Sequence, residues 1–274
     1  MCTRDEILTF SEPVLFPSVP IAYVITMEGS NRYTSLLNEL RTHRPTRTVV
    51  IVHHKPMSRC ARPSWVTRVS DDLWRNNIII AKRDPTVPVM IMEDDVRFLP
   101  RVHDYANHID QMVAGNKCEI YSLGMLPSLS FPSSRADITV FLAGGFQAVL
   151  YSSRGRNRLV REYGNDPSYR KCTMRYVLEF FRFQWLHDIE LTYNFYTLIP
   201  VRPCAVQSFP TTENQTVWRH ALLSIMFHMS GAQKDGTKLF EMQHAIGRLG
   251  GCLPFVTFVV FVLAHVLKHG GVKR

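Results

Sequence analysis

The feature that most constrains the fold is a strand, a helix and a second strand within about thirty residues near the N-terminus. Residues 21–27 read I-A-Y-V-I-T-M, an apolar run rich in β-branched side chains that predicts a buried strand. A turn and a helix from Asn31 follow, and Pro45 ends the helix. Residues 48–52 form a second apolar run. A strand–helix–strand unit of this kind predicts a parallel sheet with helices packed on it.

A later apolar run ends directly in three carboxylates. Residues 89–92 predict a buried strand, and Glu93, Asp94 and Asp95 follow it at once. Like charges this close repel one another, and a hard divalent cation would relieve the repulsion. In an open α/β sheet, ligands bind at the carboxyl ends of the strands. The triplet therefore indicates a ligand site, and a solvated acidic turn is the alternative.

The spacing of the triplet suggests which carboxylates would share a cation. On an extended segment, side chains two positions apart point to the same side, so Glu93 and Asp95 would hold the metal while Asp94 faces elsewhere. Mg²⁺ and Mn²⁺ suit carboxylate oxygens and usually complete their shell with substrate phosphates. We therefore expect Mn²⁺ or Mg²⁺ as cofactor and a nucleoside diphosphate ester as ligand.

Two later motifs are candidates for the same site. Asp188 follows His187 at the start of a predicted helix and is a candidate general base, with Glu190 as the alternate. A helix N-cap is the alternative role of Asp188. Gly144 and Gly145 separate two apolar segments, where paired glycines allow a backbone to approach a ligand closely, although a hairpin turn fits equally well.

The rest of the chain alternates between helical and strand patterns. Residues 1–19 are expected as an irregular lead-in, and 57–69 and 128–135 as loops. A run of arginines between 153 and 163 is typical of a solvated helix face, and a phosphate-facing role is the alternative. Further helices are expected at 71–82, 102–113 and 172–185, and further strands at 118–123, 138–142, 146–151 and 201–207.

Charge and cysteine content limit the surroundings of the protein. The formal charge of +9 indicates an acidic partner, which is a phosphorylated substrate, an anionic membrane or nucleic acid. No two cysteines lie close in sequence, which argues against a cysteine-rich zinc site or a disulfide framework and favours a reducing compartment. The N-terminus lacks the basic start and apolar core of a signal peptide.

The C-terminal segment is the most apolar part of the chain. Residues 249–267 carry no formal charge over about nineteen positions, just enough to span a bilayer, and basic residues follow them. A membrane anchor with the domain on the cytosolic face is one interpretation. A terminal element packed on the domain is the other, and Pro254 and His265 favour it.

Several of these motifs, taken in order, resemble glycosyltransferase family 25, which includes lipooligosaccharide and collagen galactosyltransferases and has relatives in large DNA viruses. The resemblance covers about residues 21–207 and lies in these stretches: I-A-Y-V-I-T at 21–26 with Asn31-Arg32, E-D-D-V-R-F at 93–98, G-G-F-Q-A-V-L-Y-S-S at 144–153, His187-Asp188, and P-C-A-V-Q at 203–207.

This resemblance implies a GT-A fold, an α/β architecture with a mostly parallel sheet flanked by helices. It would occupy residues 20–246, with 247–274 as the hydrophobic tail. It implies an inverting transferase that moves a sugar from a nucleotide-sugar donor, expected to be a UDP-sugar, to a hydroxyl of a glycan, glycolipid or protein; nucleic acid is not expected as a partner. Glu93 and Asp95 would hold the metal and Asp188 would lie by the acceptor. The donor side would be formed by Ile25, Thr26, Arg32, Asp94, Gly144 and Gly145.

Two alternatives remain open at the level of sequence. Family members usually carry a Ser-His pair before the acidic strand, and residues 65–77 lack it, so a non-catalytic GT-A domain acting as a membrane-tethered assembly factor is one alternative. A metal-dependent nucleotidyl- or phosphotransferase is the other; it is disfavoured because the chain has no P-loop.

Overall fold

The computed structural model describes residues 3–55, 61–66, 69–168, 187–207 and 237–249. Its helices are α1 (Tyr33–His43), α2 (Val69–Arg83), α3 (Val102–Ala114), α4 (Ser153–Tyr163), α6 (His187–Asn194) and α8 (Thr237–Arg248). Its strands are β1 (Thr3–Thr9), β2 (Ile21–Met27), β3 (Thr48–His54), β4 (Val89–Glu93), β5 (Val96–Phe98), β6 (Ile120–Ser122), β7 (Leu126–Pro132), β8 (Asp137–Gly144), β9 (Ala148–Tyr151), β10 (Thr197–Pro200) and β11 (Ala205–Gln207).

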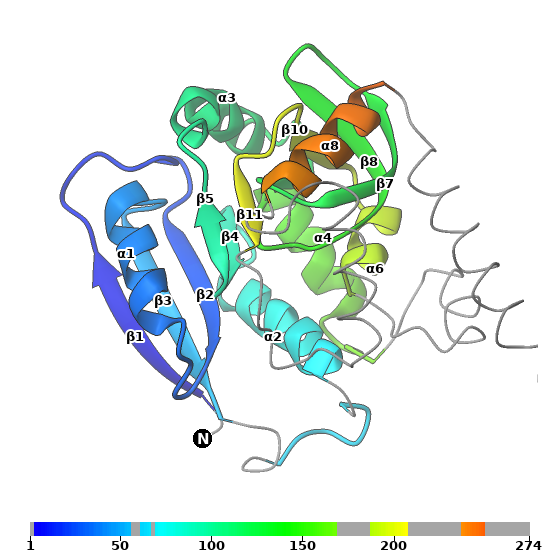
Figure 1. Ribbon diagram of the computed structural model, residues 1–274. Helices are drawn as coiled ribbons and strands as arrows, with labels where there is room; N and C mark the ends of the chain where they lie inside the picture. The colour runs from blue at the N-terminus through cyan, green and yellow to red at the C-terminus, as the bar shows by residue number, and fades with distance from the viewer. Residues whose placement is uncertain (1–2, 56–60, 67–68, 169–186, 208–236, 250–274) are drawn as a thin grey trace, which may run out of the picture.

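The centre of the fold is a nine-stranded sheet in the order β1-β3-β2-β4-β9-β6-β10-β8-β7 (Figure 1). The predicted strand–helix–strand unit is confirmed, because β2 pairs in parallel with both β3 and β4. The strands β2, β3, β4, β6, β7 and β10 run in one direction, and β1, β8 and β9 run against them. The sheet is therefore mixed, with most strands sharing one direction, and the α/β fold class is confirmed.

Both faces of the sheet are covered by helices. Successive side chains of a strand point to opposite faces of the sheet, so alternate residues of the parallel strands enter two separate apolar cores. Val24 and Met92 lie in one core, and Tyr23 and Ile91 lie in the other. Helices α1 and α3 contribute to the first core, and α2, α4 and α6 to the second. This three-layer arrangement matches the architecture expected of a GT-A-like domain.

A two-stranded sheet of β5 and β11 lies beside the main one. Its antiparallel register pairs Val96 with Gln207 and Phe98 with Ala205. Because β5 begins directly after the acidic triplet, this pairing brings Gln207, the last residue of the P-C-A-V-Q stretch, to the carboxylates. The expected strand at 201–207 is confirmed only over 205–207.

The strands β1, β7 and β10 differ from the sequence expectation, and β1 and β10 have partners far away in the sequence. Residues 3–9 were expected in an irregular lead-in but form β1, which pairs antiparallel with β3. The expected loop at 128–135 is largely β7, at the far edge of the sheet. The strand β10 was not expected and joins β6 to β8. The strands β1 and β10 gain their hydrogen bonds from distant segments, so local composition does not reveal them, whereas β7 forms a hairpin with β8 despite its Ser- and Pro-rich sequence.

One arginine of the α4 run is part of the core. Arg156 is 1% exposed, and its guanidinium donates to the carbonyl oxygens of Ile80, Ala81 and Val87 at 3.0–3.1 Å. The carbonyls of Ile80 and Ala81 belong to the last turn of α2, where no intrahelical partner exists for them. Arg156 therefore fixes the end of α2 and the turn before β4, which is neither a solvated nor a phosphate-facing role.

The predicted helix at 172–185 and the apolar segment after Leu249 lie outside the described residues. Leu249 itself is 86% exposed. In the described part of the chain, no helix is long and apolar enough to cross a bilayer. The anchor at 249–267 stays a prediction.

Candidate functional site

Most of the predicted site residues meet at one edge of the main sheet, where β2, β3 and β4 end; we call it the carboxyl edge. The antiparallel strand β9 enters the sheet from this same edge, because Ala148 pairs with Met92 and the amide of Glu93 donates to the carbonyl of Gln147 at 3.0 Å. The glycine segment before β9 therefore lies next to the acidic triplet. The carboxyl ends of parallel strands are where ligands bind in α/β sheets.

Asp94 is held by the loop that connects β2 to α1. Its carboxylate accepts hydrogen bonds from Thr26 Oγ1 at 2.7 Å, Ser30 Oγ at 2.9 Å and Arg32 Nη1 at 3.1 Å. Arg32 is the residue directly before α1, so the start of the helix fixes the guanidinium at the edge of the sheet. Thr26, Arg32 and Asp94 were all predicted to lie together, whereas Ser30 was not recognised from the sequence.

Asp95 is buried between the main sheet and the small sheet. Its Oδ2 accepts from Arg32 Nη1 at 3.3 Å and from Gln207 Nε2 at 2.6 Å. Burial raises the pKa of Asp95 to about 6, against the opposing effects of the Gln207 hydrogen bond and the Arg32 charge. The short sheet of β5 and β11 thus brings Gln207, the last residue of the 203–207 stretch, to Asp95 as a polar partner.

The extended geometry assumed for the triplet stops at Glu93. Asp94 and Asp95 form the turn between β4 and β5, so the rule that side chains two positions apart face the same way does not apply to Asp95. Asp94 does not face elsewhere: Arg32 Nη1 lies between Asp94 and Asp95 and contacts both.

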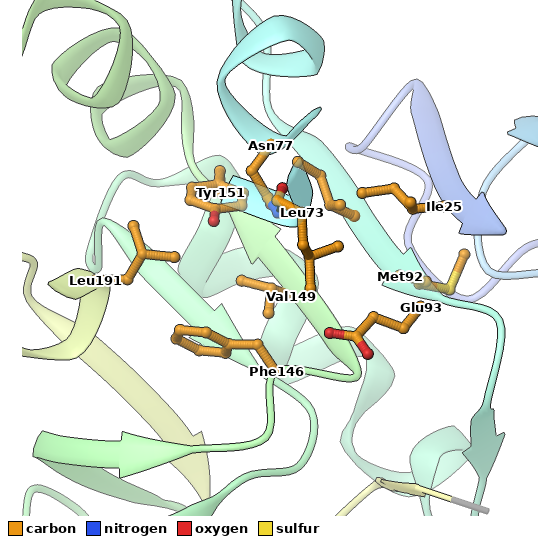
Figure 2. A pocket seen from close by; sticks show the side chains of 10 residues that line it. Ile25, Leu73, Asn77, Met92, Glu93, Phe146, Val149, Tyr151 and Leu191 are labelled. Atoms are coloured by element: carbon orange, nitrogen blue, oxygen red, sulfur yellow. Dashed lines mark hydrogen bonds between the residues drawn. The ribbon is translucent and has the colours of Figure 1, made fainter. Parts of the chain in front are cut away.

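Glu93 ends β4 and lines a cavity of about 10 Å³, room for about one water molecule. Figure 2 shows its carboxyl group extending toward Val149 and Phe146, among apolar side chains that include the predicted Ile25. Burial raises the pKa of Glu93 well above its usual value, and the charges of Asp95, Asp188 and Asp94 raise it further. The cavity is far too small for a nucleotide, so a substrate must lie outside it.

Asp188 joins this cluster through the glycine segment. Gly145 has a φ of +86°, a conformation that L side chains rarely adopt, and its amide donates to Asp188 Oδ2 at 2.7 Å. A Cβ on Gly145 would lie 2.6 Å from Gln147 Nε2, the end of a flexible side chain that can move aside, so the positive φ is the stronger reason for glycine here. Asp188 is 5% exposed and is one of the charges that act on Glu93, which places it beside the triplet.

Glu190, the alternate base, has a packing role instead. It is fully buried and accepts hydrogen bonds from Tyr163 of α4 at 2.7 Å and from Asn194 at 3.1 Å. The bond from Tyr163 joins α6 to α4 on the side of the second core, and the bond from Asn194 lies within α6. Geometry therefore favours Asp188 over Glu190 as the candidate base, and the catalytic role of Asp188 stays a prediction.

The metal-ligand role of Glu93 and Asp95 stays a prediction, and the two carboxyl groups lie in different surroundings: Glu93 in the small cavity, and Asp95 against Arg32 and Gln207. Both pKa values are raised, because burial and neighbouring negative charges disfavour ionisation, and a cation would reverse that effect. Among the described residues, no group of three or more His, Cys, Asp or Glu side chains is arranged to hold a metal. A cation here would need ligands beyond these two carboxylates, such as the phosphates of a substrate.

Comparisons with known proteins add one finding. No protein-family model and no curated protein matches the chain. A solved structure described as a glycosyltransferase involved in the glycosylation of the major capsid of PBCV-1 aligns with 75% of this chain and 100% of its own, at 11% identity and a TM-score of 0.29. A likeness this weak carries no argument about fold or activity.

Proposed function

We propose that this protein is a metal-dependent glycosyltransferase that uses a nucleotide-sugar donor and transfers the sugar to a hydroxyl group. The observation that carries the proposal is the convergence of Arg32, the Glu93–Asp95 triplet, Gly145 and Asp188 at the carboxyl edge of the sheet. These residues come from four separate parts of the chain and combine one cation with four carboxylates. Nothing in packing alone requires such a cluster.

The donor diphosphate would bind beside Arg32. Its guanidinium is the positive charge that contacts the acidic turn, and its side chain is 21% exposed, so a phosphate can reach it. Glu93 and Asp95 would hold a Mn²⁺ or Mg²⁺ ion between the turn and the phosphates. The ion would act as a Lewis acid that stabilises the charge of the departing diphosphate.

Asp188 would act as the general base. The Gly145 amide fixes Oδ2 of its carboxylate, which orients the side chain toward the acidic cluster. In the reaction the acceptor hydroxyl gives its proton to Asp188 while its oxygen bonds to the anomeric carbon, and the bond from that carbon to the diphosphate breaks. This single displacement inverts the anomeric configuration and needs no covalent intermediate.

A non-catalytic GT-A-like domain is the second candidate, and the ion pair between Arg32 and Asp95 favours it. In the structure the arginine neutralises the turn that the metal would otherwise occupy. A transferase requires Arg32 to exchange this contact for a phosphate, whereas a non-catalytic domain keeps it.

The two candidates are separated by nucleotide binding and donor turnover. The purified protein is titrated with UDP by calorimetry with and without Mn²⁺, and a set of nucleotide sugars is screened for metal-dependent hydrolysis. For a transferase we expect Mn²⁺-dependent UDP binding that Asp95→Asn reduces at least tenfold. The matched control is Asp110→Asn, a buried carboxylate of α3 that accepts from the Ser18 amide at 3.0 Å. Equal UDP affinity in Asp95→Asn and the wild type would refute the metal site, and no hydrolysis of any donor would favour the non-catalytic domain.

A further inference from the structure

Two histidines from different helices face each other on the first-core side of the domain. His43 lies in the last turn of α1 and His103 in the first turn of α3, and His43 Nδ1 is 3.2 Å from His103 Nε2. The His43 ring also packs on Phe98 of β5, with ring centroids 5.2 Å apart. His43 is largely buried whereas His103 is exposed, so the pair is open to solvent on one side.

The separation of the two nitrogens suits a shared metal ion. In a tetrahedral site with metal–nitrogen bonds of about 2.0–2.1 Å, two histidine nitrogens lie roughly 3.4 Å apart. The observed 3.2 Å is close to this distance. In the structure the two nitrogens share a hydrogen bond, and a bound metal ion would replace the proton between them.

A carboxylate lies near the other nitrogen of the His43 ring. Glu39 Oε2 lies 3.7 Å from His43 Nε2 and accepts the Phe98 amide at 3.0 Å. The 3.7 Å separation is too long for a hydrogen bond, so Glu39 places a negative charge near the second ring nitrogen without fixing the tautomer.

We propose that His43 and His103 form a second metal site, distinct from the acidic cluster, which binds imidazole-preferring divalent metals such as Zn²⁺ or Ni²⁺. In the described part of the chain no third His, Cys, Asp or Glu completes a ligand set, so water fills the remaining positions. The bound ion joins α1 to α3 and braces β5, the strand that leaves the acidic turn. This site does not depend on the proposed transferase activity.

The test is a calorimetric titration of the full chain with NiCl₂, since nickel prefers imidazole whereas the acidic cluster suits Mg²⁺ and Mn²⁺. We expect one nickel site that His103→Gln weakens at least tenfold. His103 is exposed, so this variant should fold. The matched control is His108→Gln on the same helix, whose histidine contacts Asp137 at 3.0 Å; it should keep the wild-type affinity.

Thermal unfolding gives an independent measurement. Nickel should raise the melting temperature of the wild type, of His108→Gln and of Asp95→Asn, because a ligand that binds only the folded state stabilises it. It should not raise that of His103→Gln. The proposal would be overturned if His103→Gln bound nickel as tightly as the wild type. It would also be overturned if Asp95→Asn lost nickel affinity and His103→Gln did not.

Discussion

Replacing Arg156 by methionine should destabilise the fold much more than any other change in the α4 arginine run. The guanidinium makes three hydrogen bonds to carbonyl oxygens, at 3.0, 3.0 and 3.1 Å, and is 1% exposed. A hydrogen bond with a charged group contributes about 1.5–3 kcal/mol. Three of them give roughly 4.5 kcal/mol at the lower limit of that range.

Part of this contribution is offset by the burial of the charge itself. Burial lowers the pKa of Arg156, which shows that the surroundings disfavour the charged form. Methionine regains that desolvation energy and fills most of the volume. We therefore expect Arg156→Met to lower the free energy of unfolding by about 3 kcal/mol, within the range for a broken buried polar network.

Urea unfolding monitored by tryptophan fluorescence measures this loss. The matched control is Arg158→Met, a change at another arginine of the same helix. The native Arg158 side chain is 29% exposed and pairs with Glu119 at 2.7 Å and with Glu162 at 2.8 Å. Partly exposed ion pairs of this kind contribute about 0–1 kcal/mol. If Arg156→Met lost no more stability than Arg158→Met, the assignment of Arg156 as the residue that fixes the end of α2 would be wrong.

Three further predictions concern catalysis, pH and the tail. Asp188→Asn should keep donor binding but lower turnover by about two to four orders of magnitude, the usual contribution of a general base; Glu190→Gln should stay within tenfold of wild-type turnover, and the reverse ranking would exchange the two roles. Burial lowers the pKa of His54 to about 4. In the unfolded chain the same group binds a proton near pH 6.5, which the folded protein excludes. The contribution of His54 to the free energy of unfolding is therefore complete above pH 6.5 and is lost as the pH falls toward 4. Between pH 6.5 and 5 the wild type should lose about 2 kcal/mol more than His54→Asn in urea unfolding, and equal losses would contradict this. Truncation after Leu249 keeps every described element and should move the protein from the membrane to the soluble fraction of a cell lysate; if it leaves the protein insoluble and unable to bind UDP, the segment belongs to the core.

The parts of the fold that could be predicted from sequence are those with a local signal. The apolar runs of β2, β3 and β4 have a length and composition that only buried strands explain, and α3 shows its apolar face directly. The strands β1 and β10 carry no such signal. Their stability comes from partners 39 or more residues away, such as Thr9 with Thr48, and a partner of that kind is invisible to a short window of sequence.

The residues of the candidate site divide in the same way, into those with a local signal in the sequence and those without one. The triplet stands out because its three carboxylates are adjacent in the sequence, Asp188 because it opens a predicted helix, and Arg32 through the resemblance of the motifs to a glycosyltransferase family. Ser30 and Gln207 are single polar residues whose importance depends on what lies opposite them in space. Gln207 belonged to a recognised pattern, but only the pairing of β5 with β11 shows that its amide reaches Asp95.

The pairing of β5 with β11 has a consequence for how the protein is made. In sequence, Gln207 lies 112 residues after Asp95. During translation the acidic turn therefore leaves the ribosome long before one of its partners exists, with Arg32 as the partner already synthesised. Contacts of such high sequence separation form late, because the intervening chain must first be ordered. A nascent chain that ends before β11 would already have the central strands β2, β3 and β4 but not the closed acidic turn, so we expect nucleotide binding to appear only after residue 207 has emerged.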